Sequence, residues 1–329
     1  MKKRKIISLF SGAGGLDLGF EKSGFEVVWA NEYDSTIWDT FKHNFPFTIL
    51  DPRSIKKIED IPINKDEIVG IIGGPPCQSW SEAGSLRGIN DPRGKLFFEY
   101  LRILDLVKPT FFLAENVSGM LSKRNNNALR NILELFGKDY NVEMKLLNAA
   151  DYGVPQDRKR VIIIGFRKDS EIIYEFPSPL SEKVTLKDSI YHLKDNVSKT
   201  KLKNKTKGSS LEIPNHEYMT GKFSSIYMSR NRVRSWDEQS FTIQAGGRHA
   251  PCHPQAPKMV KVEKDKMKFK HGFSSQYRRL SVRECAQIQT FPEDFIFKYN
   301  NVADGYKMVG NAVPVNLAKY LAASIQKVL

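Results

Sequence analysis

The chain has 329 residues, 40% of them hydrophobic and 27% charged, which is typical of a globular protein with a main domain and a smaller one. Lysine and arginine outnumber aspartate and glutamate by 51 to 37, so the formal net charge at pH 7 is +14. This basic excess favours a polyanionic partner, most simply nucleic acid, over a merely solvated basic surface. With three cysteines in the whole chain, a disulfide framework is not expected.

The sequence offers no segment for entering or crossing a membrane. Its apolar runs are all shorter than the roughly 18 residues that a membrane span requires. The basic N-terminus, MKKRKIISLF, has too short an apolar run for a signal peptide and no small-residue cleavage site, and it predicts a first β-strand instead. We therefore expect a cytoplasmic protein.

In the first 177 residues, short apolar runs alternate with amphipathic ones. The apolar runs are rich in β-branched and aromatic residues and lie at 6–10, 25–30, 69–72, 110–114, 142–148 and 160–166. A helical pattern at 96–107 separates two of them. Strands that alternate with helices predict an α/β fold, with a doubly wound and mostly parallel sheet covered on both faces.

The pattern changes beyond Pro177. Residues 194–210 are polar and carry six lysines. We interpret them as a mobile, solvated loop in preference to a segment that recognises a nucleic-acid sequence. Residues 211–280 contain scattered aromatic residues and arginines without a helical period. We therefore predict a larger domain at 1–177 and a smaller, irregular domain with a hinge at 178–295.

The last segment, 296–329, is predicted to return to the first domain. Pro314 suits the start of a helix, and an apolar stripe follows it at Leu317, Leu321, Ile325 and Val328. We interpret this stripe as core packing.

A tight glycine turn, FSGAGG (10–15), follows the first predicted strand and precedes a helical pattern. Such a turn lets a ligand approach the backbone, with N–H groups at the helix start directed toward it, although it can also serve as a plain connection. Glu32 follows the second strand about 20 residues downstream, where an acid binds a ribose hydroxyl in nucleotide-binding folds. Because the turn lacks the G-x-G-x-x-G fingerprint, a nucleoside without a pyrophosphate, such as S-adenosylmethionine, is favoured over NAD.

Cys77 lies in the stretch GGPPCQ (73–78), directly after the strand predicted at 69–72. Pro75 and Pro76 restrict the backbone that leads into it, so the thiol is held in one place, as a nucleophilic thiolate requires. The alternative is a buried, inert cysteine. Glu115 follows the strand predicted at 110–114, and in a parallel sheet Cys77, Glu115 and the glycine turn converge at the carboxyl edge, where such sheets bind ligands.

The other two cysteines carry no such signal. Cys285 lies in the helical pattern RECAQIQ and is expected in the core. Cys252 has His249 and His253 nearby, but three candidate ligands do not make a structural zinc site, and we expect no metal.

Several motifs, in order, resemble those of DNA (cytosine-5)-methyltransferases. They span nearly the whole chain and read FSGAGG (10–15), GPPCQ (74–78), ENV (115–117), QDRKR (156–160), RRLSVRECAQIQTFP (278–292) and GNAVP (310–314). The segments at 228–248 and 253–257 resemble HaeIII-type members of the family, which act on GGCC. The resemblance implies a catalytic, cofactor-binding domain at 1–177, with the methyltransferase fold that uses S-adenosyl-L-methionine, and a target-recognition domain at 178–295. It also implies duplex DNA as substrate, a monomer, and a modification role alongside an endonuclease that shares the site without a stable complex.

The resemblance also implies roles for catalytic residues. Cys77 would attack C6 of a cytosine flipped out of the duplex, and Glu115 would hold N3 and the exocyclic amine. Arg158 and Arg160 would bind near the base or its phosphate, or serve as plain phosphate or surface contacts.

Cofactor and DNA contacts follow from the same resemblance. The cofactor pocket would be lined by Phe10, Gly12, Gly14, Glu32, Asp51, Pro75, Asn311 and Val313, although Asp51 lacks the glycine that the family often has before it. Ile226 would fill the space that the flipped base leaves. Arg230, Arg232 and Arg248 are candidates for bidentate contacts to guanine, and some of them are expected to bind phosphates.

Three other functions are compatible with parts of the sequence. An RNA cytosine-5-methyltransferase would share Cys77 and Glu115 but needs no variable segment as long as 178–280. A catalytically silent DNA-binding relative would not be expected to retain both residues. A nucleotide-dependent oxidoreductase would call for a dinucleotide fingerprint and a second cysteine near Cys77, and binding of S-adenosylhomocysteine without binding of NAD would exclude it.

Overall fold

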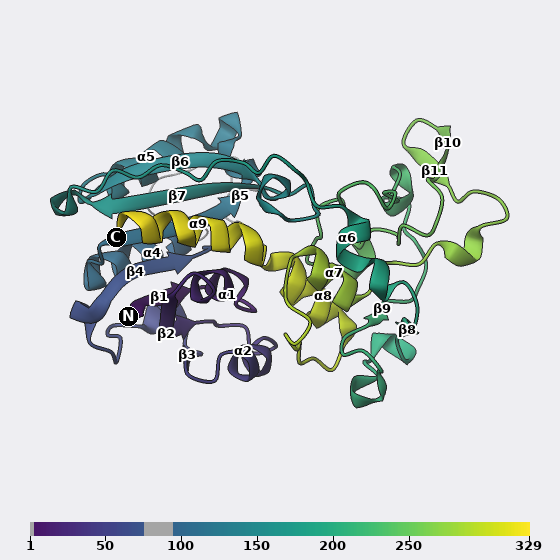
Figure 1. The fold of residues 1–329 in the computed structure, drawn as a ribbon, viewed down its shortest axis with the longest axis horizontal. Coiled ribbons are helices and arrows are strands. Elements are labelled where there is room, and N and C mark those ends of the chain that lie inside the picture. The colour runs from purple at the N-terminus through teal and green to yellow at the C-terminus, as the bar shows by residue number, and fades with distance from the viewer. Residues whose placement is uncertain (1–2, 76–94) are drawn as a thin grey trace.

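A seven-stranded sheet forms the centre of the larger domain in this computed structural model, which describes residues 3–75 and 95–329 (Figure 1). Its strands run in the order β3-β2-β1-β4-β5-β7-β6. They are β1 (Arg4–Leu9), β2 (Phe25–Asn31), β3 (Ile49–Asp51), β4 (Ile68–Gly73), β5 (Phe111–Val117), β6 (Tyr140–Asn148) and β7 (Lys159–Arg167).

Most of the sheet is parallel, as the sequence predicts. β3, β2, β1, β4 and β5 pair in parallel, whereas β7 runs antiparallel to both β5 and β6. Each of the six predicted strands is present, and the predicted fold class is confirmed. The three-residue strand β3 has no prediction, because it is too short to show an alternating pattern and its Ile49 side chain is 50% exposed.

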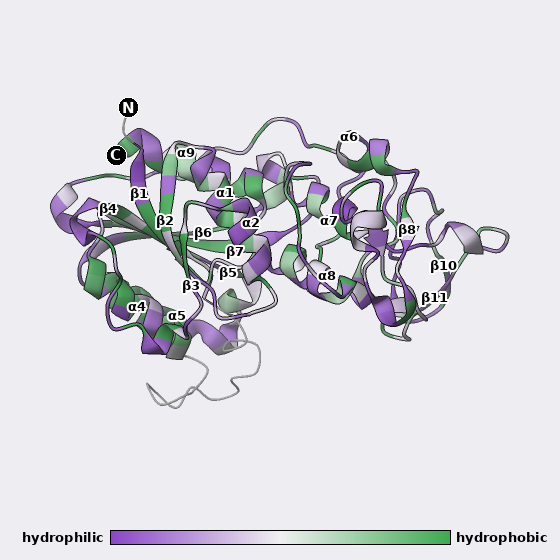
Figure 2. Ribbon diagram, turned by 90° about the horizontal axis from the view of Figure 1, so that it is seen from below, coloured by the Kyte–Doolittle hydropathy of each residue, from purple (hydrophilic) through white to green (hydrophobic). Residues whose placement is uncertain are grey.

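Helices cover both faces of the sheet. Figure 2 shows α1 (Gly15–Glu21) and α9 (Val315–Val328) on one side, and α4 (Lys95–Val107) and α5 (Asn126–Phe136) on the other. Two separate apolar clusters fill these layers, one around Phe20 and Phe111 and one around Tyr100 and Phe112. Adjacent residues of β5 therefore supply opposite cores, as the two-residue period of a buried strand requires. A further helix, α2 (Trp38–Asn44), leads into β3.

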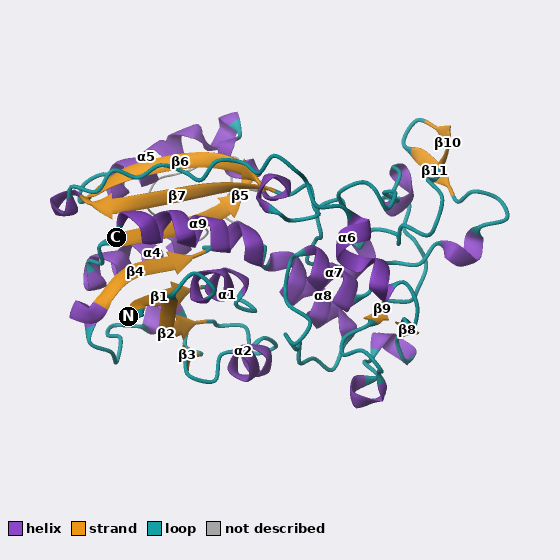
Figure 3. Cartoon of the chain, in the orientation of Figure 1, coloured by secondary structure: helices purple, strands orange, loops and turns teal. Residues whose placement is uncertain are grey.

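The smaller domain consists mostly of loops (Figure 3). Its helices are α6 (Leu186–Ile190), α7 (Val282–Ile288) and α8 (Val302–Asn311), and its short strands are β8 (Ser198–Lys199), β9 (Glu217–Tyr218), β10 (Val260–Glu263) and β11 (Lys266–Lys268). Ser281 and Glu284 form a capping box that starts α7. Glu284 is fully buried and accepts two hydrogen bonds of 2.7 Å from Arg278, so although burial opposes ionisation, the pKa of Glu284 falls to about 2.

Within the described ranges, the structure contains no helix with the length and apolar composition needed to cross a membrane.

The last helix packs against the first one. α1 and α9 approach so closely that a Cβ built on Gly19 would lie 2.3 Å from Cβ of Ala318 and 2.7 Å from the backbone nitrogen of Lys319. The apolar stripe of α9 therefore belongs to the core of the sheet domain. This packing brings the end of the chain to the helix that follows the glycine turn.

We predict that Gly19→Ala destabilises the protein by about 1–3 kcal/mol, because the added methyl group would push α9 away from α1. The free energy of unfolding from urea titration measures this change. Gly119→Ala is the matched control, since among the described residues a Cβ there would meet only the Val117 side chain, at 3.8 Å. Equal stability of the two variants would contradict the tight α1–α9 contact.

Candidate active site

The glycine turn after β1, residues 10–15, contains three residues in the left-handed region of backbone conformation. Phe10, Gly12 and Gly14 have φ values of 54°, 56° and 85°, in the region that favours glycine. A Cβ on Gly12 would have no atom of the described residues within 4 Å, whereas one on Gly14 would strike the Phe45 ring at 2.2 Å. The turn therefore leaves open space beside Gly12, where a ligand can approach the backbone.

Glu32 lies against this turn. One of its carboxylate oxygens accepts a hydrogen bond of 2.9 Å from the Gly12 nitrogen, and the other accepts one of 2.7 Å from the Asp34 nitrogen. Burial raises the pKa of Glu32, partly offset by these backbone hydrogen bonds. The structure thus places Gly12 and Glu32 together, as the sequence predicts for a nucleoside site.

Asp51 lies one strand further along the same edge. The Glu32 nitrogen donates to the Asp51 backbone oxygen at 3.2 Å, so the ends of β2 and β3 are joined. The Asp51 carboxylate is itself bound by the Arg53 guanidinium at 2.6 Å. Burial opposes ionisation of the Asp51 carboxyl group, but the hydrogen bonds from Arg53 outweigh it and lower the pKa of Asp51. Asp51 is therefore an anion, and its carboxylate oxygens already have hydrogen-bond partners.

The C-terminal motif reaches the same region. A Cβ on Gly15, at the start of α1, would lie 2.4 Å from the Val313 backbone oxygen, so these segments are in contact. Val313 is buried, and Asn311 is exposed at the end of α8. Tyr33 directly follows Glu32 in the chain and was not predicted as a site residue. Its side chain is 72% exposed. Its exposure and its position next to Glu32 make Tyr33 a candidate for stacking on the base of a bound nucleoside.

Glu115 is near the end of β5, within the strand and not after it as the sequence suggested. Its carboxylate forms a 2.7 Å ion pair with Arg160 on β7, and both side chains are 12% exposed. A Cβ on Gly74 would lie 3.1 Å from Glu115 Oε2, and Asn116 Nδ2 donates to the Pro75 oxygen at 3.2 Å. The segment that leads toward Cys77 is therefore fixed beside Glu115, while Cys77 itself lies outside the described residues.

Arg158 occupies a different place from the one the sequence suggested. Its side chain is 1% exposed, and its guanidinium donates to the backbone oxygens of Ile243, Gly310 and Ala312 at 2.8, 2.8 and 3.1 Å. These hydrogen bonds connect the sheet domain to the recognition segment, which lies within residues 178–295, and to the C-terminal motif GNAVP (310–314). It leaves the guanidinium no path to a base or a phosphate.

Two glutamines extend this tie, and sequence analysis did not single them out. Gln156 donates to Gln289 at 2.8 Å and accepts from the Ile243 nitrogen at 2.8 Å. Gln289 in turn donates to the Val309 oxygen at 2.9 Å and the Ala312 oxygen at 3.2 Å. Both side chains are fully buried. The signal in the sequence that could have identified them is their position inside the motifs QDRKR and RECAQIQ.

The predicted DNA-contacting residues divide into exposed and buried ones. Ile226 is 69% exposed, and Arg230 and Arg248 are exposed as well. Arg232 is buried, with Nε bound to the Tyr227 oxygen at 2.7 Å and Nη2 to the Ile226 oxygen at 2.9 Å. Arg232 thus supports the turn that presents Ile226, and it would reach DNA only after releasing these carbonyls.

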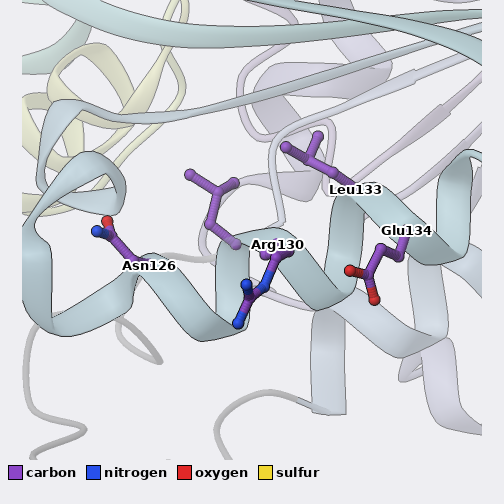
Figure 4. Close-up of a pocket in the computed structure, with 5 residues that line it drawn as sticks. Asn126, Arg130, Leu133 and Glu134 are labelled. Carbon is purple, nitrogen blue, oxygen red and sulfur yellow. The ribbon is translucent and has the colours of Figure 1, made fainter.

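A hollow of about 470 Å³ lies along the outer face of α5 (Figure 4). It is lined by Asn126, Leu129, Arg130, Leu133 and Glu134. None of the predicted site residues within 3–75 and 95–329 lines it, so it is separate from the edge that carries Glu32 and Glu115.

The family model for C-5 cytosine-specific DNA methylases matches residues 4–327. The chain belongs to this family. It is 58% identical to Type II methyltransferase M.FnuDI of Fusobacterium nucleatum over 99% of this chain and 95% of the relative, and 58% identical to M.NgoPII of Neisseria gonorrhoeae over 99% and 96%. Among solved structures, a putative DNA modification methyltransferase of E. coli encoded within a prophage has a TM-score of 0.73 at 24% identity, covering 98% of this chain and 99% of that one, which shows the shared fold.

This DNA (cytosine-5)-methyltransferase belongs to a family whose methyl donor is S-adenosylmethionine. The residues present fit a nucleoside donor: Gly12 leaves open space, Glu32 presents a carboxylate beside it, and Ser11 Oγ is buried without a hydrogen-bond partner among the described residues. Membership in a DNA methylase family favours this activity over the oxidoreductase and RNA methyltransferase alternatives.

We predict that Glu115→Gln lowers kcat for methyl transfer roughly 10²–10⁴-fold, because an amide cannot exchange the proton or carry the charge that a carboxyl group does. Steady-state kinetics with labelled donor measure kcat, and calorimetry with S-adenosylhomocysteine should show unchanged binding. Glu99→Gln is the control, since Glu99 also pairs with an arginine at 2.7 Å, on the surface of α4. An unchanged kcat in Glu115→Gln would remove Glu115 from the chemistry.

Proposed function

We propose that this enzyme methylates C5 of the inner cytosine of GGCC in duplex DNA and that it is the modification half of a restriction–modification system. The Glu115–Arg160 pair beside Gly74 and Pro75 carries the chemical part of the proposal, because it places a held carboxylate next to the segment that leads to Cys77. The variable segment at 228–248 supports the GGCC target through its HaeIII-type motif. Relatives named Type II methyltransferases support the modification role.

Cys77 begins the proposed reaction as a thiolate. Its sulfur forms a bond to C6 of the flipped cytosine, and the electron pair of the C5–C6 double bond shifts toward N3 and C5, which makes C5 nucleophilic. Bound S-adenosylmethionine supplies an electrophilic methyl group on its sulfonium. After C5 is methylated, a base removes the C5 proton and the C6–sulfur bond breaks, which restores the aromatic ring and the thiolate.

Glu115 and Arg160 stabilise the ring during these steps. Glu115 donates a proton to N3, where negative charge develops as sulfur adds to C6, and it accepts a hydrogen bond from the exocyclic amine. Arg160, 2.7 Å from Glu115, fixes the orientation of the carboxylate and adds positive charge near the base. Arg158 acts on this site only through position, by holding the segments that surround it.

The recognition segment supplies the contacts to the duplex. Flipping a base costs a few kcal/mol, and Ile226, exposed at the tip of its turn, is placed to fill the vacated space. We assign the exposed Arg230 and Arg248 to guanines or phosphates of the site. Arg232 couples the conformation of this turn to DNA binding, because any contact that Arg232 makes with DNA requires it to release the backbone carbonyls of Ile226 and Tyr227. The enzyme acts as a monomer, and a cognate endonuclease shares its site without a stable complex.

The target is tested with two duplexes, one with a single GGCC and one with that site scrambled, incubated with labelled S-adenosylmethionine. We expect 5-methylcytosine in the GGCC duplex alone. Label in both duplexes would contradict the GGCC assignment and retain the chemistry. Label in neither would contradict the proposed reaction on DNA and would favour the catalytically silent relative.

Cys77→Ala should abolish methyl transfer and leave duplex binding intact. Product analysis measures the first and fluorescence anisotropy the second. Cys252→Ala is the matched control, because Cys252 is a buried cysteine hydrogen-bonded to the Tyr227 hydroxyl at 3.2 Å in the smaller domain. Methylation by Cys77→Ala would exclude Cys77 as the nucleophile.

A further inference from the structure

The hairpin formed by β10 and β11 is a dense patch of positive charge at the outer end of the smaller domain (Figure 1). Between residues 258 and 271 the chain has six lysines and two acidic residues. All six lysines are exposed. Lysines on exposed strands hinder edge-to-edge pairing, but this many like charges also repel one another across a narrow ribbon.

Strand geometry places some of these lysines in a row. In β11, Lys266 and Lys268 point to one face, while Met267 points to the other and packs on the core of the smaller domain. Residues two apart in a strand are about 6.6–6.8 Å apart, and Lys264 precedes the row at the tip. A row of ammonium groups with this spacing suits a polyanion, such as a DNA strand that carries a phosphate every 3.4 Å along the helix axis.

Few of these charges are neutralised by the protein. Lys266 pairs with Glu263 across the hairpin, and Lys258 pairs with Glu238, both as exposed contacts of little energetic weight. Lys261, Lys264 and Lys268 have no ion pair with any residue in the described ranges. The hairpin therefore presents charge that a partner can use.

The base of the hairpin is fixed to the turn that presents Ile226. Phe269, just after β11, stacks on Tyr277 with ring centroids 4.1 Å apart and contacts Phe223 at 5.1 Å. Phe223 in turn contacts Tyr227, which directly follows Ile226, with ring centroids 4.8 Å apart. At the other end, the Met259 nitrogen donates to Asn231 at 3.0 Å, next to Arg230. The lysine hairpin is thus rigidly connected to both sides of the proposed DNA-contacting turn.

We propose that the β10–β11 hairpin is a second DNA-binding surface, which binds phosphates of the duplex outside the recognised base pairs. The inference rests on the proposed function, because it extends the duplex that Ile226 and Arg230 contact. Its lysines provide affinity that does not depend on sequence and does depend on salt, since each phosphate contact releases counterions. Its aromatic base orients the Ile226 turn on the duplex before the site is read.

The lysine run at 194–207 offers a matched comparison within the same domain. Lys199, Lys201 and Lys203 are exposed and have the same two-residue spacing as Lys264, Lys266 and Lys268. Their segment is tied to α8 and the loop before it, through Asn301 Nδ2 to the Lys203 oxygen at 3.0 Å and the Thr206 nitrogen to the Asn300 oxygen at 3.0 Å. It has no contact with the Phe269–Tyr277–Phe223–Tyr227 cluster among the described aromatic contacts.

The test compares a hairpin variant, Lys264→Gln/Lys266→Gln/Lys268→Gln, with a control variant, Lys199→Gln/Lys201→Gln/Lys203→Gln. Dissociation constants are measured by fluorescence anisotropy at several salt concentrations. One duplex ends close to the GGCC site, and the other extends about one helical turn, about 10 base pairs, on each side. Methyl transfer to the short duplex at saturation and thermal unfolding report that both variants are folded and active.

We expect the hairpin variant to bind the long duplex roughly ten-fold more weakly than the wild type, with a salt slope smaller by about 2–3. Its binding to the short duplex should match the wild type, and the control variant should match the wild type on both duplexes. Equal losses in both variants, or an equal loss on both duplexes, would overturn the inference. Wild-type protein that binds neither duplex would instead overturn the proposed function itself, and the inference with it.

Discussion

One buried guanidinium holds together three parts of this methyltransferase that are far apart in the sequence. Arg158 stands just before β7, and its three carbonyl partners belong to the recognition segment and the C-terminal motif. A buried carbonyl left without a donor costs about 1–3 kcal/mol, and a buried charge without partners costs more. The placement of the recognition segment relative to the edge that carries Gly12 and Glu32 therefore depends on this side chain.

The arginines of this chain serve two physical purposes, and burial separates them. Arg158 and Arg232 use their donors on backbone carbonyls and so shape loops that have little regular secondary structure. Arg160, two residues from Arg158, pairs instead with Glu115 beneath the segment that leads to Cys77. Arg230, Arg248 and the hairpin lysines remain exposed, and they are the residues that we propose to contact DNA. The net charge of +14 thus overstates the DNA-binding surface, because part of it is internal support.

Local sequence patterns predict the sheet well because its strands are long and apolar or end in distinctive turns. The glycine turn and Glu32 were placed together for the same reason: each follows a strand in a parallel sheet. The role of Arg158 was beyond sequence reasoning, since its carbonyl partners, Ile243, Gly310 and Ala312, are 85 to 154 residues away and a motif does not show which arginine points inward. The irregular character of the smaller domain was predicted, but strand β3 and the short strands β8, β9, β10 and β11 were not, because segments of two to four residues are too short to show a period.

The central claim is that Cys77, which follows the segment held beside the Glu115–Arg160 pair, attacks the cytosine that this enzyme methylates. It is tested most directly by mass spectrometry of the enzyme after incubation with S-adenosylmethionine and a GGCC duplex that carries 5-fluorocytosine at the inner cytosine. Fluorine at C5 cannot leave as the proton does, so the sulfur–C6 bond should persist. The account predicts a protein–DNA adduct on the peptide that contains Cys77. Absence of an adduct, or an adduct on another residue, would contradict it.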